Sequence, residues 1–380
     1  MTKGIILSGG WGTRLRPLTC TLPKTLIPIV NKPVIERQIL LLKAAGVKDI
    51  ILAISVMGDI LQNYFKNGEK WGINLQYTDE KRPMGTAGAV KLAEDLLKDD
   101  KFFMLNGDVI LNFDFTQMIK IHNQYGGIGV IASKLVDDPS RYGVLIVEEN
   151  SSKILKFLEK SEYAPLDGKY IPMPINAGIY LFEPEILSYI EPLKKVSIER
   201  EIFPRLAGEG KLYHYAIPGV WKDIGKPEEL LEGNISLLND ILKNSEKKNL
   251  IDDNLDIEDK VIIYPPVAIG ENVVIRKNCK VGPNTIIGNN VYIDTNSEIK
   301  ESLIYNEAYI NKNVKIENAI ISDNCLIHDN VVLKGNGHNL VILASYVEVM
   351  ENLKLIAPSN NSITVCHHEI VKEWELLKNV

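Results

Sequence analysis

The residues best suited to chemistry lie near the start of the chain, where three glycines follow a short apolar run. Residues 5–7 predict a buried strand, and Gly9, Gly10 and Gly12 form the turn directly after it. Glycine lets backbone N–H groups approach an anion closely, and it adopts a positive φ without strain. The stretch therefore predicts a phosphate-binding loop at the end of a strand.

Cations follow this turn at Arg14, Arg16 and Lys24. Fixed positive charges beside a glycine turn suit a polyphosphate. Two common phosphate motifs do not fit, because the Gly-Lys-Ser/Thr ending of a P-loop is absent and Leu15 stands where a dinucleotide fingerprint needs glycine.

Two carboxylates also follow apolar runs. Asp108 comes after residues 102–105, and Asp223 comes after residues 213–217. Carboxylate oxygens beside a polyphosphate suit a hard divalent cation, so we interpret the two as metal ligands. The plainer alternatives are a turn or helix cap for Asp108 and a cap for Asp223 at the helix that begins near Pro227.

Composition excludes several classes of protein. The 380 residues are 45% hydrophobic and 24% charged with a net charge of −6, which is typical of a globular chain with room for two domains and disfavours nucleic-acid binding. No signal peptide or membrane-length apolar run is evident, so we expect a cytoplasmic protein without membrane contact. The four cysteines have no zinc or disulfide spacing.

Residues 1–243 alternate between apolar runs and segments of helical spacing. Strands are predicted at 50–54, 102–105, 128–131 and 178–182, and helices at 33–45, 86–97 and 228–242. This order predicts an α/β domain built on a layered sheet. In such sheets ligands bind at the carboxyl ends of strands, where the glycine turn and Asp108 are expected.

The sequence changes character after residue 243. Residues 244–260 read as a polar linker, and aliphatic residues then recur every six positions. The repeat includes Ile269, Ile275, Val281, Ile287 and Ile293, and its phase slips before Ile304 and again before Ile321. Hexads predict a left-handed parallel β-helix over 261–345. A tail at 346–380 would hold a short helix at 369–378 that caps the coil.

Nine motifs of the first domain resemble those of the sugar-1-phosphate nucleotidyltransferases, and most resemble the mannose-1-phosphate guanylyltransferases. In order they are GGWGTRLRPLT, PKTL, RPMGTAGAV, LNGDV, RYGVL, FLEK, NAGIY, SIEREIFP and WKDIG. The resemblance implies a Rossmann-like mixed sheet. It also implies transfer of a nucleotidyl group from an NTP, with GTP expected, to a sugar 1-phosphate, with mannose 1-phosphate expected, and release of pyrophosphate.

The resemblance also assigns roles to residues. The glycine turn and Arg14 would hold the β- and γ-phosphates, and Lys24 the α-phosphate. The remaining nucleotide contacts would come from Leu7, Thr13, Gly85, Thr86 and Asn106, with Gly85 and Thr86 at the base. The sugar phosphate would contact Gly143, Glu159, Lys160, Asn176 and Gly178. Asp108 and Asp223 would bind Mg²⁺ as the cofactor.

Alternatives remain at this stage. The same reaction could use UTP or dTTP with another sugar 1-phosphate, or the chain could be a non-catalytic homologue that binds sugar nucleotide and controls a partner. Thr86 also reads as the N-cap of the helix that follows it. The coil suggests homo-oligomerisation or, with His328 or His338 as the catalytic base, acyl transfer.

Overall fold

The computed structural model describes residues 2–164 and 169–372. Contacts divide the chain into two compact units. The first comprises Met1–Trp11 and Val34–Trp221, and the second comprises Gly12–Pro33 and Lys222–Val380. No helix in the described ranges is both long and apolar enough to cross a membrane.

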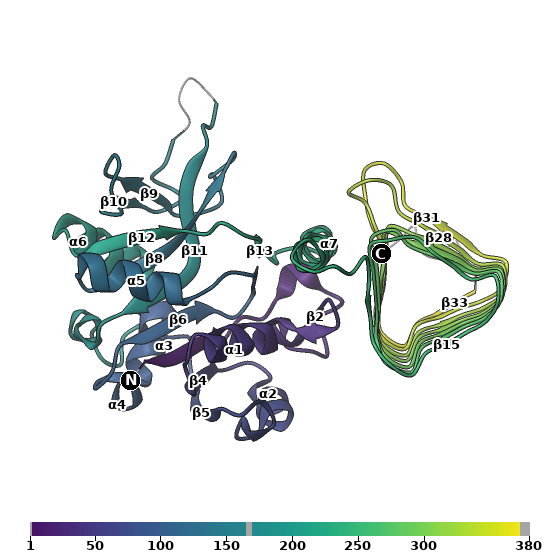
Figure 1. The fold of residues 1–380 in the computed structure, drawn as a ribbon, viewed down its shortest axis with the longest axis horizontal. Helices are drawn as coiled ribbons and strands as arrows, with labels where there is room; N and C mark the ends of the chain where they lie inside the picture. Colours follow the sequence, from purple (N-terminus) through teal and green to yellow (C-terminus); the bar gives the residue numbers. More distant parts are fainter. Residues whose placement is uncertain (1, 165–168, 373–380) are drawn as a thin grey trace. The chain divides into compact units, whose positions relative to one another are not determined.

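The first unit is built on a mixed sheet of nine strands (Figure 1). The strand order β10-β9-β11-β6-β1-β4-β5 is extended by β8, which pairs with β11 and β12. The strands are β1 (Lys3–Ser8), β4 (Asp49–Ile54), β5 (Asn74–Asp79), β6 (Phe102–Asn106), β8 (Gly129–Val136), β9 (Val144–Val147), β10 (Ile154–Leu158), β11 (Met173–Phe182) and β12 (Leu212–Ala216). The predicted α/β mixed sheet is therefore confirmed.

Helices and a short strand complete this unit. They are α1 (Val34–Ala44), α2 (Gly58–Phe65), α3 (Gly85–Leu92), α4 (Glu94–Leu97), β7 (Val109–Leu111), α5 (Thr116–Tyr125) and α6 (Phe203–Gly208). Ala87 and Val90 of α3 and Phe203 of α6 share one buried core with Ile5 and Met104 of the sheet. Burial of this apolar face is what holds the strand ends in fixed positions.

The second unit contains a triangular coil of three parallel sheets (Figure 1). The first sheet comprises β14 (Leu250–Ile251), β17 (Val267–Ile269), β20 (Thr285–Ile287), β23 (Leu303–Ile304), β26 (Ala319–Ile321), β29 (Val341–Leu343) and β32 (Ile363–Val365). The second comprises β15 (Asp256–Ile257), β18 (Val274–Ile275), β21 (Tyr292–Ile293), β24 (Tyr309–Ile310), β27 (Leu326–Ile327), β30 (Glu348–Val349) and β33 (Ile370–Val371). The third comprises β16 (Ile262–Ile263), β19 (Lys280–Val281), β22 (Glu298–Lys300), β25 (Lys315–Glu317), β28 (Val332–Lys334) and β31 (Lys354–Ile356).

The hexad aliphatics fill the interior of this coil, which confirms the predicted β-helix. Ile275, Ile293 and Ile310 align on successive strands and are fully buried. The turns at one corner carry an asparagine ladder in which each side chain bonds the next, over Asn278, Asn296, Asn313, Asn330 and Asn352 at 2.9–3.2 Å. All five have a positive φ, which asparagine tolerates better than most residues.

The strands of the coil extend beyond both ends of the predicted range. β14 and β15 lie in the segment interpreted as a linker, and β30 to β33 lie in the segment interpreted as a tail. Residues 370–371, expected to be helical, form β33, and residues 373–378 of that predicted helix lie outside the described residues.

The segment Gly12–Pro33, which follows the first glycines of the predicted phosphate loop, belongs to the same unit as the coil. β2 (Pro28–Ile29) and β3 (Lys32–Pro33) form a hairpin beside α7 (Pro227–Lys243), where Asn234 Oδ1 accepts from the Val30 N–H at 2.7 Å. Asn31 Nδ2 donates to the Ile287 carbonyl of the coil at 2.8 Å. That residue 243 ends the first folding domain, before the linker and the coil, remains a prediction.

Candidate active site

Predicted nucleotide-binding residues of the first unit lie at the carboxyl ends of parallel strands. β1 pairs with β6 in a register that places Leu7 beside Asn106, and the Gly107 N–H donates to the Leu7 carbonyl at 2.9 Å. Gly9 follows β1 directly, and its carbonyl accepts from Ser55 Oγ at 2.9 Å. Ser55 itself follows β4, so three adjacent strands bring these turns to one edge of the sheet.

Asp108 occupies a tight turn between β6 and β7 rather than a helix cap. Gln38 of α1 holds this turn. Its Nε2 donates to the carbonyls of Asn106 at 2.9 Å and Val109 at 3.0 Å, which flank the turn on both sides. Gln38 is only 1% exposed, so these bonds are shielded from water. Gln38 was not among the predicted site residues, although a polar residue on the apolar face of α1 was a signal for it.

Replacing Gln38 with leucine should destabilise the fold. Both carbonyls would be left buried without their donor, and unsatisfied buried groups of this kind cost about 1–3 kcal/mol. Urea unfolding should show this loss, whereas Gln62→Leu on the exposed face of α2 should change the free energy of unfolding little. Equal effects of the two substitutions would show that the Gln38 bonds do not stabilise the turn.

Gly178 must be glycine where β11 passes Asn106. Its φ is +75°, and an added Cβ would lie 2.7 Å from Asn106 Nδ2. The side chain of Asn176 is oriented at both ends, since its Oδ1 accepts from the Gly178 N–H at 3.0 Å and its Nδ2 bonds to the Tyr180 hydroxyl at 2.9 Å. Burial, reinforced by the charge of Glu199, raises the pKa of Tyr180 well above its ordinary value, so this hydroxyl stays neutral.

The other predicted sugar-phosphate residues lie at strand ends, with Gly143 directly before β9 and Glu159 and Lys160 directly after β10. The Asn176 N–H donates to the Gly143 carbonyl at 2.8 Å, so these two residues are adjacent. Glu159 Oε1 lies 3.6 Å from the Arg200 side chain, and Lys160 is exposed. The structure therefore places Gly143 and Asn176 together and pairs Glu159 with a residue of the SIEREIFP motif.

The turn at Gly85 and Thr86 packs against the same motif. Gly85 has a φ of +75°, and an added Cβ would lie 2.5 Å from the Val196 carbonyl. Thr86 Oγ1 donates to Glu199 Oε2 at 2.8 Å and accepts from the Ile198 N–H at 3.0 Å. The N-cap interpretation of Thr86 is wrong, because α3 begins one residue earlier and the hydroxyl is engaged with a distant segment.

The second unit holds the remaining predicted phosphate contacts. Gly12 has a φ of +60°, and an added Cβ would lie 3.1 Å from the Cβ of Lys24, so a side chain there would be strained and tightly packed. Lys24 is only 9% exposed. Thr13 and Arg14 lie in a short 3₁₀ turn, Thr13–Leu15. A buried lysine beside a glycine turn can neutralise a polyphosphate without competition from water.

Arg14 lies against the backbone of Gly225 in the WKDIG motif. An added Cβ at Gly225 would come within 3.2 Å of the Arg14 guanidinium, and the Gly225 N–H donates to Glu229 Oε2 at 2.7 Å. Sequence reasoning assigned no role to Gly225, yet its lack of a side chain leaves room for Arg14.

Asp223 ends β13 (Trp221–Asp223). The alternative that it caps α7 is wrong, since the capping position is Lys226. Within the first unit, Trp221 Nε1 donates to the Ala177 carbonyl at 2.8 Å, which fixes the start of this strand beside β11. Asp108 belongs to the first unit and Asp223 to the second.

The donor set fits Mg²⁺. Each predicted ligand is a carboxylate at the end of a strand, and no cluster of three or more His, Cys, Asp or Glu suited to a metal occurs among residues 2–164 and 169–372. Mg²⁺ is commonly bound by one or two carboxylates together with substrate phosphates rather than by an all-protein cage.

Comparison with known proteins places the chain in a family. A family model described as nucleotidyl transferase matches residues 3–240. The chain belongs to the nucleotidyl transferase family. A second model, described as GMPPB C-terminal domain, matches residues 263–378 of this nucleotidyl transferase. The predicted family and enzyme class are thereby confirmed.

Named relatives cover most of this nucleotidyl transferase. The mannose-1-phosphate guanyltransferase of Saccharomyces cerevisiae is 42% identical over 250 residues, which cover 65% of this chain and 67% of the relative. The mannose-1-phosphate guanylyltransferase catalytic subunit beta of Danio rerio is also 42% identical, with coverage of 65% and 67%. Among solved structures, HddC from Yersinia pseudotuberculosis complexed with GMP-PN is 28% identical with a TM-score of 0.52, covering 62% of this chain and 98% of HddC.

Proposed function

We propose that the chain transfers a guanylyl group from GTP to mannose 1-phosphate, forming GDP-mannose and pyrophosphate. The observation that carries this proposal is the 42% identity to two proteins named as enzymes of that specificity. The GMP-PN ligand of the HddC structure is in keeping with a guanine nucleotide.

The proposed roles of the residues follow from their chemistry. The turn at Gly9, Gly10 and Gly12 presents N–H groups to phosphate oxygens, Arg14 neutralises the β- and γ-phosphates, and the buried Lys24 contacts the α-phosphate. Gly85 and Thr86 would contact the base through their backbone, since the Thr86 hydroxyl is already bonded within the protein.

The sugar phosphate would lie along the adjacent strands. The amide of Asn176 and the carboxylate of Glu159 would meet the sugar hydroxyls beside Gly143, and the exposed Lys160 would pair with the phosphate. The fixed orientation of Asn176 supports this assignment, because a preoriented amide loses little entropy when it binds.

The reaction needs no proton shuttle. The attacking phosphate oxygen is ionised at neutral pH and pyrophosphate is a stable leaving group, so positioning and charge neutralisation account for catalysis. Asp108 and Asp223 would hold Mg²⁺, which when bound neutralises phosphate charge. Arg14 and Lys24 would act in the same way from the protein side.

A substrate panel tests this proposal. GTP, UTP, dTTP and ATP would each be combined with the 1-phosphates of mannose, glucose, galactose and N-acetylglucosamine, and pyrophosphate release would be followed. We expect the highest kcat/KM for GTP with mannose 1-phosphate. A higher value with UTP or dTTP would reject the guanylyl assignment, and no turnover with any pair would favour the regulatory homologue.

The sequence also suggested acyl transfer and homo-oligomerisation as roles of the coil. The two histidines considered for acyl transfer have different surroundings: His328 Nε2 lies 2.7 Å from Glu348 Oε1, whereas the His338 side chain is 90% exposed. Acyl transfer by the coil remains an alternative. Homo-oligomerisation through the coil and a cytoplasmic location remain predictions.

A further inference from the structure

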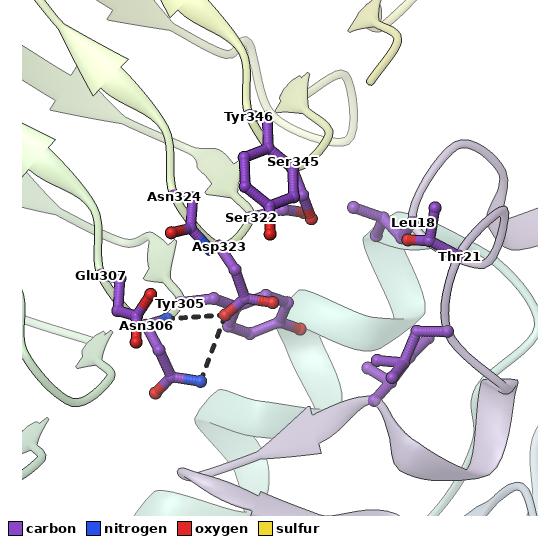
Figure 2. Close-up of a pocket in the computed structure, with 12 residues that line it drawn as sticks. Leu18, Thr21, Tyr305, Asn306, Glu307, Ser322, Asp323, Asn324, Ser345 and Tyr346 are labelled. Atoms are coloured by element: carbon purple, nitrogen blue, oxygen red, sulfur yellow. Dashed lines mark hydrogen bonds between the residues drawn. The ribbon is translucent and has the colours of Figure 1, made fainter. Parts of the chain in front are cut away.

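The second unit contains a cavity that none of the assigned roles uses. It has a volume of about 410 Å³ and lies between the loop at residues 18–27 and one corner of the coil (Figure 2). Three successive rungs contribute to the coil side, at residues 305–307, 322–324 and 345–346. A volume of this order is typical of sites that hold one small molecule.

The two walls of this cavity differ in chemistry. Leu18, Leu22 and Ile27 make the loop side mostly apolar. The coil side presents amide, hydroxyl and carboxylate groups, among them Asp323 and Glu307. No lysine or arginine occurs among the described residues that line the cavity, so a phosphate group would meet uncompensated negative charge there.

Asp323 is the best-defined acceptor in the cavity. Its Oδ1 accepts from the backbone N–H of Asn306 at 2.9 Å and from Asn306 Nδ2 at 3.1 Å (Figure 2). Both bonds end on the same oxygen, so the lone pairs of Oδ2 can accept from a ligand. Partial burial raises the pKa of this carboxyl group, which a hydrogen-bond donor from a ligand would offset.

These features select a class of ligand. A metal ion is disfavoured, because Asp323 and Glu307 are the only carboxylates among the described lining residues and they form no cluster of three or more metal-binding side chains. An uncharged ring with an apolar face and hydroxyl donors at its edge matches both walls. We propose that this cavity binds a sugar ring, either as a free hexose or as the sugar end of a nucleotide sugar, with Asp323 accepting from its hydroxyl groups.

Saturation-transfer NMR on the full chain with free D-mannose as the probe tests the proposal. Wild-type protein should give a saturable mannose signal without nucleotide, so the result does not depend on the proposed transfer reaction. Asp323→Asn should weaken mannose binding about tenfold, because one charge-assisted hydrogen bond is lost. Asp329→Asn is the matched control, since Asp329 Oδ1 accepts from the Lys312 N–H at another corner of the coil.

A second variant tests the proposal even if Asp323→Asn does not fold. Ser345→Phe adds bulk to the cavity from the coil side, and it should abolish the mannose signal. If GDP-mannose suppresses the mannose signal that depends on Asp323, the ligand is the sugar end of a nucleotide sugar. If this signal persists in the presence of GDP-mannose, the ligand is a free hexose. The proposal is overturned if wild-type protein gives no signal, or if the signal is the same in wild type and in every folded variant.

Discussion

Asp108→Ala should lower kcat/KM for pyrophosphate release by about 10²- to 10³-fold, as does loss of a preorganised group at other charge-stabilising sites. The proposed reaction joins two polyanions, so its barrier depends on the positive charge that this carboxylate anchors. Asp223→Ala should cause a loss of the same order. The turn between β6 and β7 is retained in the Asp108 variant because the Gln38 bonds are made to backbone carbonyls.

A matched control separates this effect from general loss of charge. Asp95→Ala removes an exposed carboxylate of the same unit, paired with Lys98 on the surface, and should leave turnover unchanged. Mn²⁺ binding in the presence of nucleotide, followed by electron paramagnetic resonance, should weaken in both the Asp108 and Asp223 variants. Folded variants that keep full turnover and full Mn²⁺ affinity would refute their assignment as metal ligands.

Sequence patterns predicted the turn at Asp108 because an apolar run ending in Asn-Gly-Asp is local information. Gln38 could not be found in the same way. It lies 68 residues before Asn106, and only packing of α1 against the sheet brings its amide to the two carbonyls. The same holds for Thr86, whose hydroxyl bonds to the backbone 112 residues later instead of capping its own helix.

The limits of the coil were missed for a related reason. A hexad repeat can be recognised only while the spacing of its aliphatic residues stays constant. Successive rungs of the coil are first 18 and then 17 residues apart, and the next rung is longer, since Ile321 aligns with Leu343. An excursion at these extra residues is closed by the bridge between Asn336 and Asn339, after which β29 to β33 resume the coil. At the other end, Ile251 of β14 and Ile257 of β15 continue the six-residue spacing back from Ile269, but the polar and charged residues around them favoured the interpretation as a linker.

Ile310→Ala should lower the free energy of unfolding of the coil by about 2–5 kcal/mol, the range for truncating a buried aliphatic side chain. Ile310 is fully buried and aligns with Ile293 and Ile327 on the neighbouring rungs, so no polar group or solvent can fill the space that it leaves. Urea unfolding followed by circular dichroism measures the loss.

Tyr309 provides the control, since it occupies the same strand but faces outward and is 54% exposed. Tyr309→Ala removes only a stack on Tyr292, with ring centroids 5.9 Å apart, which is worth about 0.5–1.5 kcal/mol. In a coil, each rung is stabilised mainly by its two neighbours, so the Ile310 gap weakens both adjacent interfaces at once. If Tyr309→Ala proved as destabilising as Ile310→Ala, the inward and outward assignment of the hexad, and with it the registration of the coil, would be wrong.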